Sequence, residues 1–298
     1  MDNSITLISP AKLNLFLHIN RKRGPSEEFA GYHELQTIFQ MLDRGDKMDF
    51  EATKNTDIVV TPSIENISLE ENLVYKAAIA LQQKYQVHKG AKIHLDKVLP
   101  MGGGLGGGSS NAATTILALN HLWNLNLSTN ELASLGATLG ADVPVFIHGK
   151  TAWAEGIGEQ ITPIDITENW YLIITPNCHV STAEIFSHQG LTRDTPKQRI
   201  APALEGHIYK HFKNDFEIIV SKMYPEIQKA LNWLNHYGQG KLTGSGACCF
   251  CQFNSKAEAQ QVLNEAKTKF KGFIAKGVNL SPAIQKLNEA EAFATNHS

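Results

Sequence analysis

The stretch Pro100-Met101-Gly102-Gly103-Gly104-Leu105-Gly106-Gly107-Gly108-Ser109-Ser110 decides the fold of this chain. Its run of glycines is free to adopt positive φ angles that other residues avoid. Apolar alternation predicts a strand over 91–95 before it, and Ser109, Ser110 and Asn111 are typical helix-start residues before a buried helix over 112–122. Strand, glycine loop and helix N-terminus together predict a phosphate cradle.

This stretch partly matches two common phosphate-binding loops. The glycine spacing from Gly103 to Gly108 suits a Walker A loop, but Ser109 stands where that loop needs its lysine. Gly102-x-Gly104-x-x-Gly107 matches the dinucleotide fingerprint, although no strand ending in an acidic residue follows about 20 residues later. A nicotinamide-dependent oxidoreductase therefore stays open as an alternative.

Composition describes an ordinary globular chain of 298 residues with a formal net charge of −2. That charge gives no reason to expect nucleic acid or a membrane as partner. A signal peptide and an apolar run of membrane-spanning length are both missing from the sequence, so we expect a cytoplasmic protein. Cys248, Cys249 and Cys251 lack the paired spacing of a zinc site and are expected to be reduced, buried strand residues.

Alternation after Pro10 predicts a strand that places Lys12 and Asn14 on one face. Polar residues 21–31 predict a loop before a strand over 32–39. A turn is expected at 43–46, followed by a hairpin formed by 48–50 and 57–60. Asn72 is expected to cap a helix over 73–85, and Ser128 to open one that stops at Gly140. Asp142 lies just past that stop, where its charge opposes the helix dipole, which makes it a functional candidate.

The second half predicts a split β-α-β domain. Strands are expected at 170–176 and 273–278, and helices at 182–186, 216–223, 225–235 and 257–270. A second glycine cluster, from Gly238 to Gly246, leads into a strand that carries the cysteines.

Three separated motifs resemble the signature motifs of the GHMP kinases: Pro10-Ala11-Lys12-Leu13-Asn14-Leu15, the stretch at 100–111, and Leu242-Thr243-Gly244-Ser245-Gly246-Ala247. The resemblance implies an α+β, two-domain fold with the active site between the domains. Residues 1–160 would form an N-terminal domain of the ribosomal-protein-S5-like domain 2 type, and 161–298 a ferredoxin-like C-terminal domain. Gly31-Tyr32-His33 and Gly140-Ala141-Asp142-Val143-Pro144 further resemble the branch that phosphorylates the 2-hydroxyl of a cytidine-diphosphate-linked methylerythritol, a step in isoprenoid biosynthesis.

Carried onto this sequence, the resemblance implies that Asp142 is the general base and that Lys12 positions it and stabilises negative charge. Tyr32 and Phe186 would sandwich the cytosine, with His33 as its hydrogen-bonding reader. Asn14 and Thr182 would contact polar groups of the acceptor. The residues implied for ATP are Asn72, Lys97, Pro100, Met101, Gly102, Gly103, Gly104, Leu105, Gly106, Gly107, Gly108, Ser109, Ser110, Gly244, Ser245 and Gly246.

The chain departs from the family pattern in one place, the extended segment from Arg21 to His33, where Ala30 replaces the usual aspartate. Mg²⁺ is expected with ATP, held mainly by phosphates and water, and no residue is predicted as its ligand. The only partner expected is the small-molecule substrate, for a monomer or weak homodimer. A GHMP kinase for another alcohol, such as mevalonate or homoserine, and a non-catalytic nucleotide-binding regulator complete the alternatives.

Overall fold

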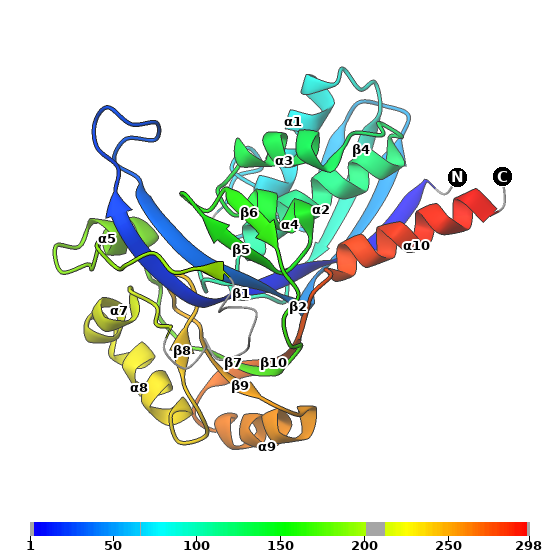
Figure 1. Ribbon diagram of the computed structural model, residues 1–298. Coiled ribbons are helices and arrows are strands. Elements are labelled where there is room, and N and C mark those ends of the chain that lie inside the picture. The colour runs from blue at the N-terminus through cyan, green and yellow to red at the C-terminus, as the bar shows by residue number, and fades with distance from the viewer. Residues whose placement is uncertain (1–2, 66, 201–211, 297–298) are drawn as a thin grey trace.

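A computed structural model describes residues 3–65, 67–200 and 212–296. The described strands join in one ten-stranded sheet, whose main path runs β3-β4-β2-β10-β7-β9-β8. Two long antiparallel strands, β1 (Ser4–Lys22) and β2 (His33–Thr53), lie between an upper and a lower half and end in a protruding hairpin (Figure 1). Lys12, Asn14 and His33, which are described below, lie on this pair of strands.

The upper half places helices on the face of a mixed sheet (Figure 1). Its other strands are β3 (Ile58–Thr61), β4 (Gly90–Asp96), β5 (Ala152–Glu155) and β6 (Gln160–Pro163), and its helices are α1 (Leu73–Lys84), α2 (Gly107–Leu122), α3 (Thr129–Ala137) and α4 (Val143–His148). Helix α2 is apolar on nearly every side and is buried against α1, α4 and strand β1. This central burial fixes where the α2 N-terminus, and so the glycine loop, must lie.

The lower half has the β-α-β-β-α-β order of a ferredoxin-like domain. Its elements are β7 (Trp170–Thr175), α5 (Thr182–Ser187), α7 (Glu217–Met223), α8 (Pro225–Leu234), β8 (Lys241–Leu242), β9 (Cys249–Phe253), α9 (Lys256–Ala266) and β10 (Lys271–Val278). The strands pair antiparallel in the order β10-β7-β9-β8, with α8 and α9 packed beneath them. The expected split β-α-β domain is thereby confirmed.

Three expectations for the first half are wrong. Residues 43–46 continue β2 instead of turning, because Gly45 lets β2 pass close to the Ser9 carbonyl: an added Cβ would lie 1.8 Å from that oxygen. The hairpin of 48–50 with 57–60 does not form, since β3 pairs parallel with β4 while β4 pairs with β2. Helix α2 begins at Gly107 rather than after Ser109, with Gly106 as its N-cap.

Helix α10 (Pro282–Asn296) was not foreseen. It follows β10 but packs against β1 and α2 of the upper half, so the chain returns to the domain where it began (Figure 1). The proposed boundary at 160/161 stays a prediction. The antiparallel pairing of β10 with β2 also joins the two halves, through the pairs Gly277–Leu42 and Val278–Met41.

The cysteine prediction agrees with the structure in burial and in the free thiols, but Cys248 lies outside the strand. Cys249 and Cys251 lie in β9, Cys248 directly precedes it, and all three are buried and unpaired. Burial raises the pKa of Cys248 to about 12 and that of Cys251 to about 11, so these thiols stay protonated near neutral pH. Among the described residues, no helix is both long and apolar enough to cross a bilayer.

Candidate active site

The glycine loop curls through three left-handed residues, with φ of +66° at Gly102, +74° at Gly104 and +72° at Gly106. Only glycine takes these angles freely. At Gly104 a Cβ would also lie 2.1 Å from the carbonyl oxygen of Thr243, so the loop is pressed against the second glycine motif. The amides of Ala247 and Cys248 donate to the carbonyls of Gly102 and Gly103 at 3.3 and 3.1 Å, which locks the two motifs together.

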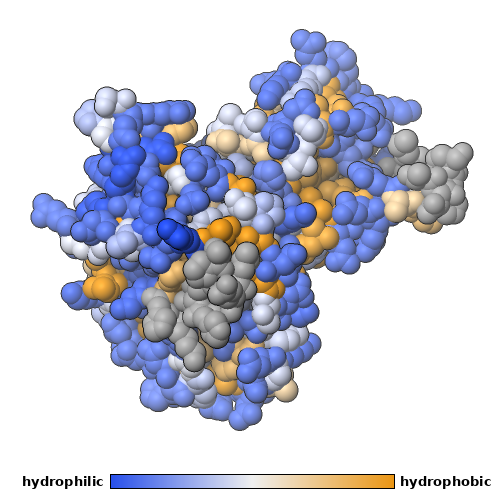
Figure 2. Space-filling model, in the orientation of Figure 1, coloured by the Kyte–Doolittle hydropathy of each residue, from blue (hydrophilic) through white to orange (hydrophobic). Residues whose placement is uncertain are grey.

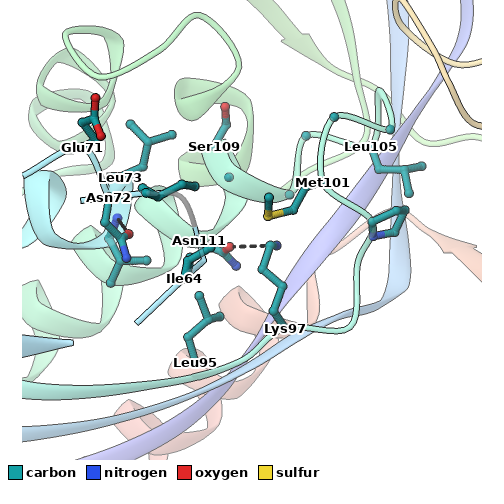
Figure 3. A pocket seen from close by; sticks show the side chains of 18 of the residues that line it. Ile64, Glu71, Asn72, Leu73, Leu95, Lys97, Met101, Leu105, Ser109 and Asn111 are labelled. Carbon is teal, nitrogen blue, oxygen red and sulfur yellow. Dashed lines mark hydrogen bonds between the residues drawn. The ribbon is translucent and has the colours of Figure 1, made fainter. Parts of the chain in front are cut away.

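A cavity of about 410 Å³ opens beside this loop (Figure 3). Of the residues predicted to bind ATP, those that line it are Asn72, Lys97, Pro100, Met101, Gly102, Gly103, Gly104, Leu105, Gly106, Gly107, Gly108 and Ser109. Ile64, Ile67 and Leu73 give it apolar surface, and the α2 N-terminus gives it backbone amides that have no acceptor within the helix. It therefore combines an apolar part with an anion-attracting part, as a nucleotide requires.

Four predicted ATP residues lie elsewhere. Ser110 is fully buried, and its hydroxyl accepts a hydrogen bond from Ser9 Oγ at 2.8 Å. Gly244, Ser245 and Gly246 belong to the motif behind the glycine loop and do not line this cavity. Their roles toward ATP stay predictions.

Asn72 caps α1 as predicted, because its Oδ1 accepts from the Val74 amide at 2.9 Å. Its carboxamide is thereby fixed at the cavity wall opposite Lys97 (Figure 3). Lys97 places its amino group near Gly107, since a Cβ on that glycine would lie 3.3 Å from Nζ. A lysine thus reaches the α2 N-terminus from the strand side, although the loop itself contains none.

Sequence reasoning missed Asp46, which holds this lysine. Asp46 is fully buried in β2 and accepts from Lys97 Nζ at 2.5 Å and from Asn111 Nδ2 at 3.0 Å. The amides of Val98 and Leu99 also donate to its Oδ1, both at 2.8 Å. One carboxylate therefore fixes Lys97, the chain leading into the glycine loop and the first turns of α2. Asp46 stands among the charged residues Asp43, Arg44 and Lys47, so the local sequence did not mark it as buried.

Beside the cavity, Lys12 is the central residue of a second group of predicted site residues. Its backbone amide donates to the Leu105 carbonyl at 3.0 Å, which ties β1 to the glycine loop. Its Nζ, on a side chain only 3% exposed, donates to Asn14 Oδ1 at 2.6 Å and to the Gly104 carbonyl at 3.1 Å. The Asp142 carboxylate lies 3.5 Å from the same Nζ. Burial lowers the pKa of Lys12, and the charge of Asp142 opposes that shift.

Asp142 is the N-cap residue of α4, but its side chain makes no capping hydrogen bond. Its carboxylate is 36% exposed and so can meet a substrate. The structure thus brings Lys12, Asn14 and Asp142 together beside the glycine loop, as the motifs predicted. Asn14 is fixed by Thr37 and Thr243, which were not among the predicted site residues. Its side-chain Nδ2 donates to Thr37 Oγ1 at 2.9 Å, and its backbone N–H donates to Thr243 Oγ1 at 3.0 Å.

A third group of residues lies between the hairpin and α5. The ring of His33 stacks on Phe186 with centroids 5.1 Å apart and 28° between the planes. Tyr32 is 57% exposed and instead contacts Phe29 of the extended loop, at 6.1 Å between centroids. Thr182 shares a 2.7 Å hydrogen bond with Ser245, which links α5 to the second glycine motif.

The extended loop is held by charges. Arg21 forms a bidentate pair with Glu27 at 2.8 and 2.7 Å and also donates to Glu34 at 2.6 Å. Arg23 donates to the same Glu34 carboxylate at 3.3 Å and lies over the Phe29 ring. The hairpin tip is mostly hydrophilic and stands apart from the upper half across a notch in the outline (Figure 2). The ion pair of Glu27 with Arg21 thus holds the extended loop, which is the segment where the chain departs from the family pattern.

The dinucleotide alternative is wrong on topology. It requires a parallel strand after the helix that follows the glycine loop. Here α2 is followed by α3 and α4, and the next strand, β5, pairs antiparallel with β2 and β6.

Comparisons with known proteins agree with the fold and the motifs. Residues 72–150 match the model for the GHMP kinases N terminal domain, and residues 202–272 match GHMP kinases C terminal. The 4-diphosphocytidyl-2-C-methyl-D-erythritol kinase of Hahella chejuensis is 50% identical over 97% of this chain and 98% of its own. The kinase of the same name from Haemophilus influenzae is 51% identical over 97% of this chain and 90% of its own length.

Solved structures agree as well. A crystal structure of 4-(cytidine 5'-diphospho)-2C-methyl-D-erythritol kinase, 26% identical, superposes with a TM-score of 0.80 over 92% of this chain and all of the other. The mevalonate kinase of Methanococcus jannaschii, 17% identical, shares the fold with a TM-score of 0.64 over 94% and 99%. Near-complete coverage at about half identity shows that the chain belongs to the 4-diphosphocytidyl-2-C-methyl-D-erythritol kinase family of the GHMP kinases.

Proposed function

We propose that this chain transfers the γ-phosphoryl group of ATP to the 2-hydroxyl of 4-diphosphocytidyl-2-C-methyl-D-erythritol, giving the 2-phosphate and ADP, in the methylerythritol phosphate route to isoprenoids. The observation that carries the proposal is the contact of Lys12 with both Asp142 and the glycine loop, at 3.5 Å and 3.1 Å. The amino group of Lys12 therefore lies beside both the candidate base, Asp142, and the candidate phosphate-binding loop. The names of the relatives supply the acceptor.

In the proposed reaction, the substrate hydroxyl oxygen forms a bond to the γ-phosphorus while the bond from that phosphorus to the bridging oxygen of ADP breaks. Asp142 takes the hydroxyl proton, a contribution typically worth 10² to 10⁴ in rate. Lys12 holds Asp142 in place and stabilises negative charge on the transferring oxygens. Because Lys12 is itself fixed by Asn14 and Gly104, it needs little reorganisation when that charge develops.

The amides at the start of α2 and the positive end of its dipole would bind the triphosphate. Lys97, oriented by Asp46 toward Gly107, would add a cation on the strand side. The apolar wall of Ile64 and Leu73, with the fixed carboxamide of Asn72, would receive the adenine. Gly244 to Gly246 would support the loop from behind.

Mg²⁺ fits this arrangement as a companion of ATP. Among the described residues, no group of three histidine, cysteine, aspartate or glutamate side chains is placed to hold a metal ion. The Ser109 hydroxyl at the cavity would be the protein's oxygen donor, and phosphates and water would complete the shell. When bound, the ion would neutralise charge on the phosphates.

For the acceptor, Tyr32 and Phe186 would hold the cytosine between aromatic faces, with His33 at its edge. Because His33 already stacks on Phe186, the base would enter on the side open to the exposed Tyr32. Asn14 and Thr182 would contact the polar groups between the base and the reacting hydroxyl. The proposal includes two domains with a boundary near 160 and a cytoplasmic monomer or weak homodimer with no nucleic-acid or membrane partner.

The test is ADP formation by the purified protein with ATP, Mg²⁺ and the cytidine-linked alcohol, run beside mevalonate, homoserine and galactose. We expect turnover with the cytidine-linked alcohol alone. Phosphorylation of another alcohol in its place would retain the kinase chemistry and discard the base pocket. ATP binding without turnover of any acceptor would support a regulator instead.

A further inference from the structure

Arg193, which follows α5 and was not among the predicted site residues, joins three parts of the base region. Its Nε donates to His33 Nε2 at 2.9 Å. One terminal nitrogen donates to the carbonyls of Phe186 and His188 at 2.8 and 3.0 Å, and the other to the Leu191 carbonyl at 3.1 Å. Four hydrogen bonds therefore fix the guanidinium on His33, the histidine that stacks on Phe186.

The bond to His33 dictates where the imidazole proton lies. A guanidinium nitrogen is always a donor and never an acceptor. His33 Nε2 must therefore present its lone pair, so a neutral His33 carries its proton on Nδ1. In the part of the chain that the structure describes, Arg193 is the only side chain that hydrogen-bonds to this ring.

The surroundings also oppose a second proton on the ring. His33 is 8% exposed, and its ring stacks on that of Phe186. Its strand partner in the β1–β2 ladder is Lys22, a second cation beside Arg193. Burial lowers the pKa of His33, and the charges of Arg193 and Lys22 lower it further.

We propose that Arg193 is a specificity-positioning residue, which holds His33 as the neutral Nδ1–H tautomer so that the ring presents a hydrogen-bond donor to the base. Cytosine N3 is an acceptor and satisfies that donor, whereas uracil N3 carries a hydrogen that opposes it. A site built to hydrogen-bond one group of a ligand discriminates strongly against an analogue that cannot form that bond. The tautomer follows from this chain's contacts, and its use in reading the base rests on the proposed function.

The tautomer can be measured without turnover. The ring nitrogens of His33 in ¹⁵N-histidine-labelled protein distinguish protonated from unprotonated positions, and a His33→Gln variant identifies its signals among the 12 histidines. We expect Nδ1 protonated and Nε2 unprotonated in the unaltered protein, and loss of this pattern in Arg193→Met. Nε2–H in the unaltered protein, or an unchanged pattern in Arg193→Met, would overturn the proposal.

The second measurement is the ratio of kcat/KM for the cytidine-linked alcohol to that for its uridine-linked analogue. We expect Arg193→Met to reduce this ratio about 10-fold or more, and Arg193→Lys, which keeps a donor for Nε2, to retain part of it. Arg44→Met removes an exposed guanidinium that lies over the Phe273 ring, 11 positions along β2 from His33, and should leave the ratio unchanged. Equal losses for both acceptors in Arg193→Met would make the residue merely structural and contradict the proposal.

The two proposals fail separately. If the unaltered protein does not phosphorylate the cytidine-linked alcohol, the proposed function falls, while the nitrogen spectra still decide what Arg193 does to His33. If that activity is present and the tautomer does not depend on Arg193, only the present inference falls.

Discussion

The amino group of Lys12 lies 3.5 Å from the carboxylate of Asp142, although 130 positions in the chain separate the two residues. Lys12 comes from β1, and Asp142 from the N-terminus of α4. The pair forms because the α4 segment packs on α2 while the Lys12 backbone hydrogen-bonds to the loop that begins α2. A single buried helix thus sets the distance between the proposed base and its cation.

Asp142→Asn keeps the size of the side chain and removes its basicity. Steady-state kinetics should show kcat reduced by at least about 10², with the KM for ATP within a few-fold of the unaltered enzyme. Asp165→Asn, at an exposed position between β6 and β7, is a control for the same chemical exchange and should leave kcat unaltered. Unchanged turnover in Asp142→Asn would remove this residue from the base role.

Asp46→Asn leaves an oxygen for the amides of Val98 and Leu99 but no charge for Lys97. We expect the KM for ATP to rise about 10-fold with a smaller change in the KM for the acceptor, because the lysine loses its orientation. Asp215→Asn is the matched control, since that carboxylate accepts from the Ile19 amide and Thr195 Oγ1. A rise of equal size in both variants would mean that general destabilisation is responsible.

Tyr32→Ala removes an exposed ring with little loss of packing. Stacking on a base is worth about 1–3 kcal/mol, so the KM for the cytidine-linked alcohol should rise about 10-fold while that for ATP stays constant. Phe29→Ala tests whether the extension supports Tyr32 through their edge contact, and a smaller rise is expected. Equal effects of Tyr32→Ala on both substrates would show a structural role instead.

Gly104→Ala combines a left-handed backbone with a Cβ 2.1 Å from the Thr243 carbonyl oxygen. Backbone strain alone costs about 1–2 kcal/mol, and the clash adds to it, so thermal unfolding should show a lowered Tm. Gly31→Ala is the control: φ is +85° there, but no atom lies within 4 Å of the added Cβ. A Tm for Gly104→Ala no lower than that of Gly31→Ala would refute the close approach of the two glycine motifs.

Much was determined by the sequence alone. The motifs at 10–15, 100–111 and 242–247 indicated the GHMP fold, and the caps at Asn72 and Ser128 were predicted because capping depends on residues only two or three positions apart. The apolar composition of α2 was equally local. Lys12 and Asp142 were identified because each lies within a distinctive motif or breaks a local rule.

Tertiary structure decided what depends on distant contacts. Asp46 lies at the site only because β2 continues without a turn beside β4. The expected hairpin does not form because β3 pairs parallel with β4 instead. Arg193 joined the base region through a segment 160 positions from His33. Strand register and the partners of a buried charge are settled by the packing of the whole chain, so residues near in sequence carry no signal for them.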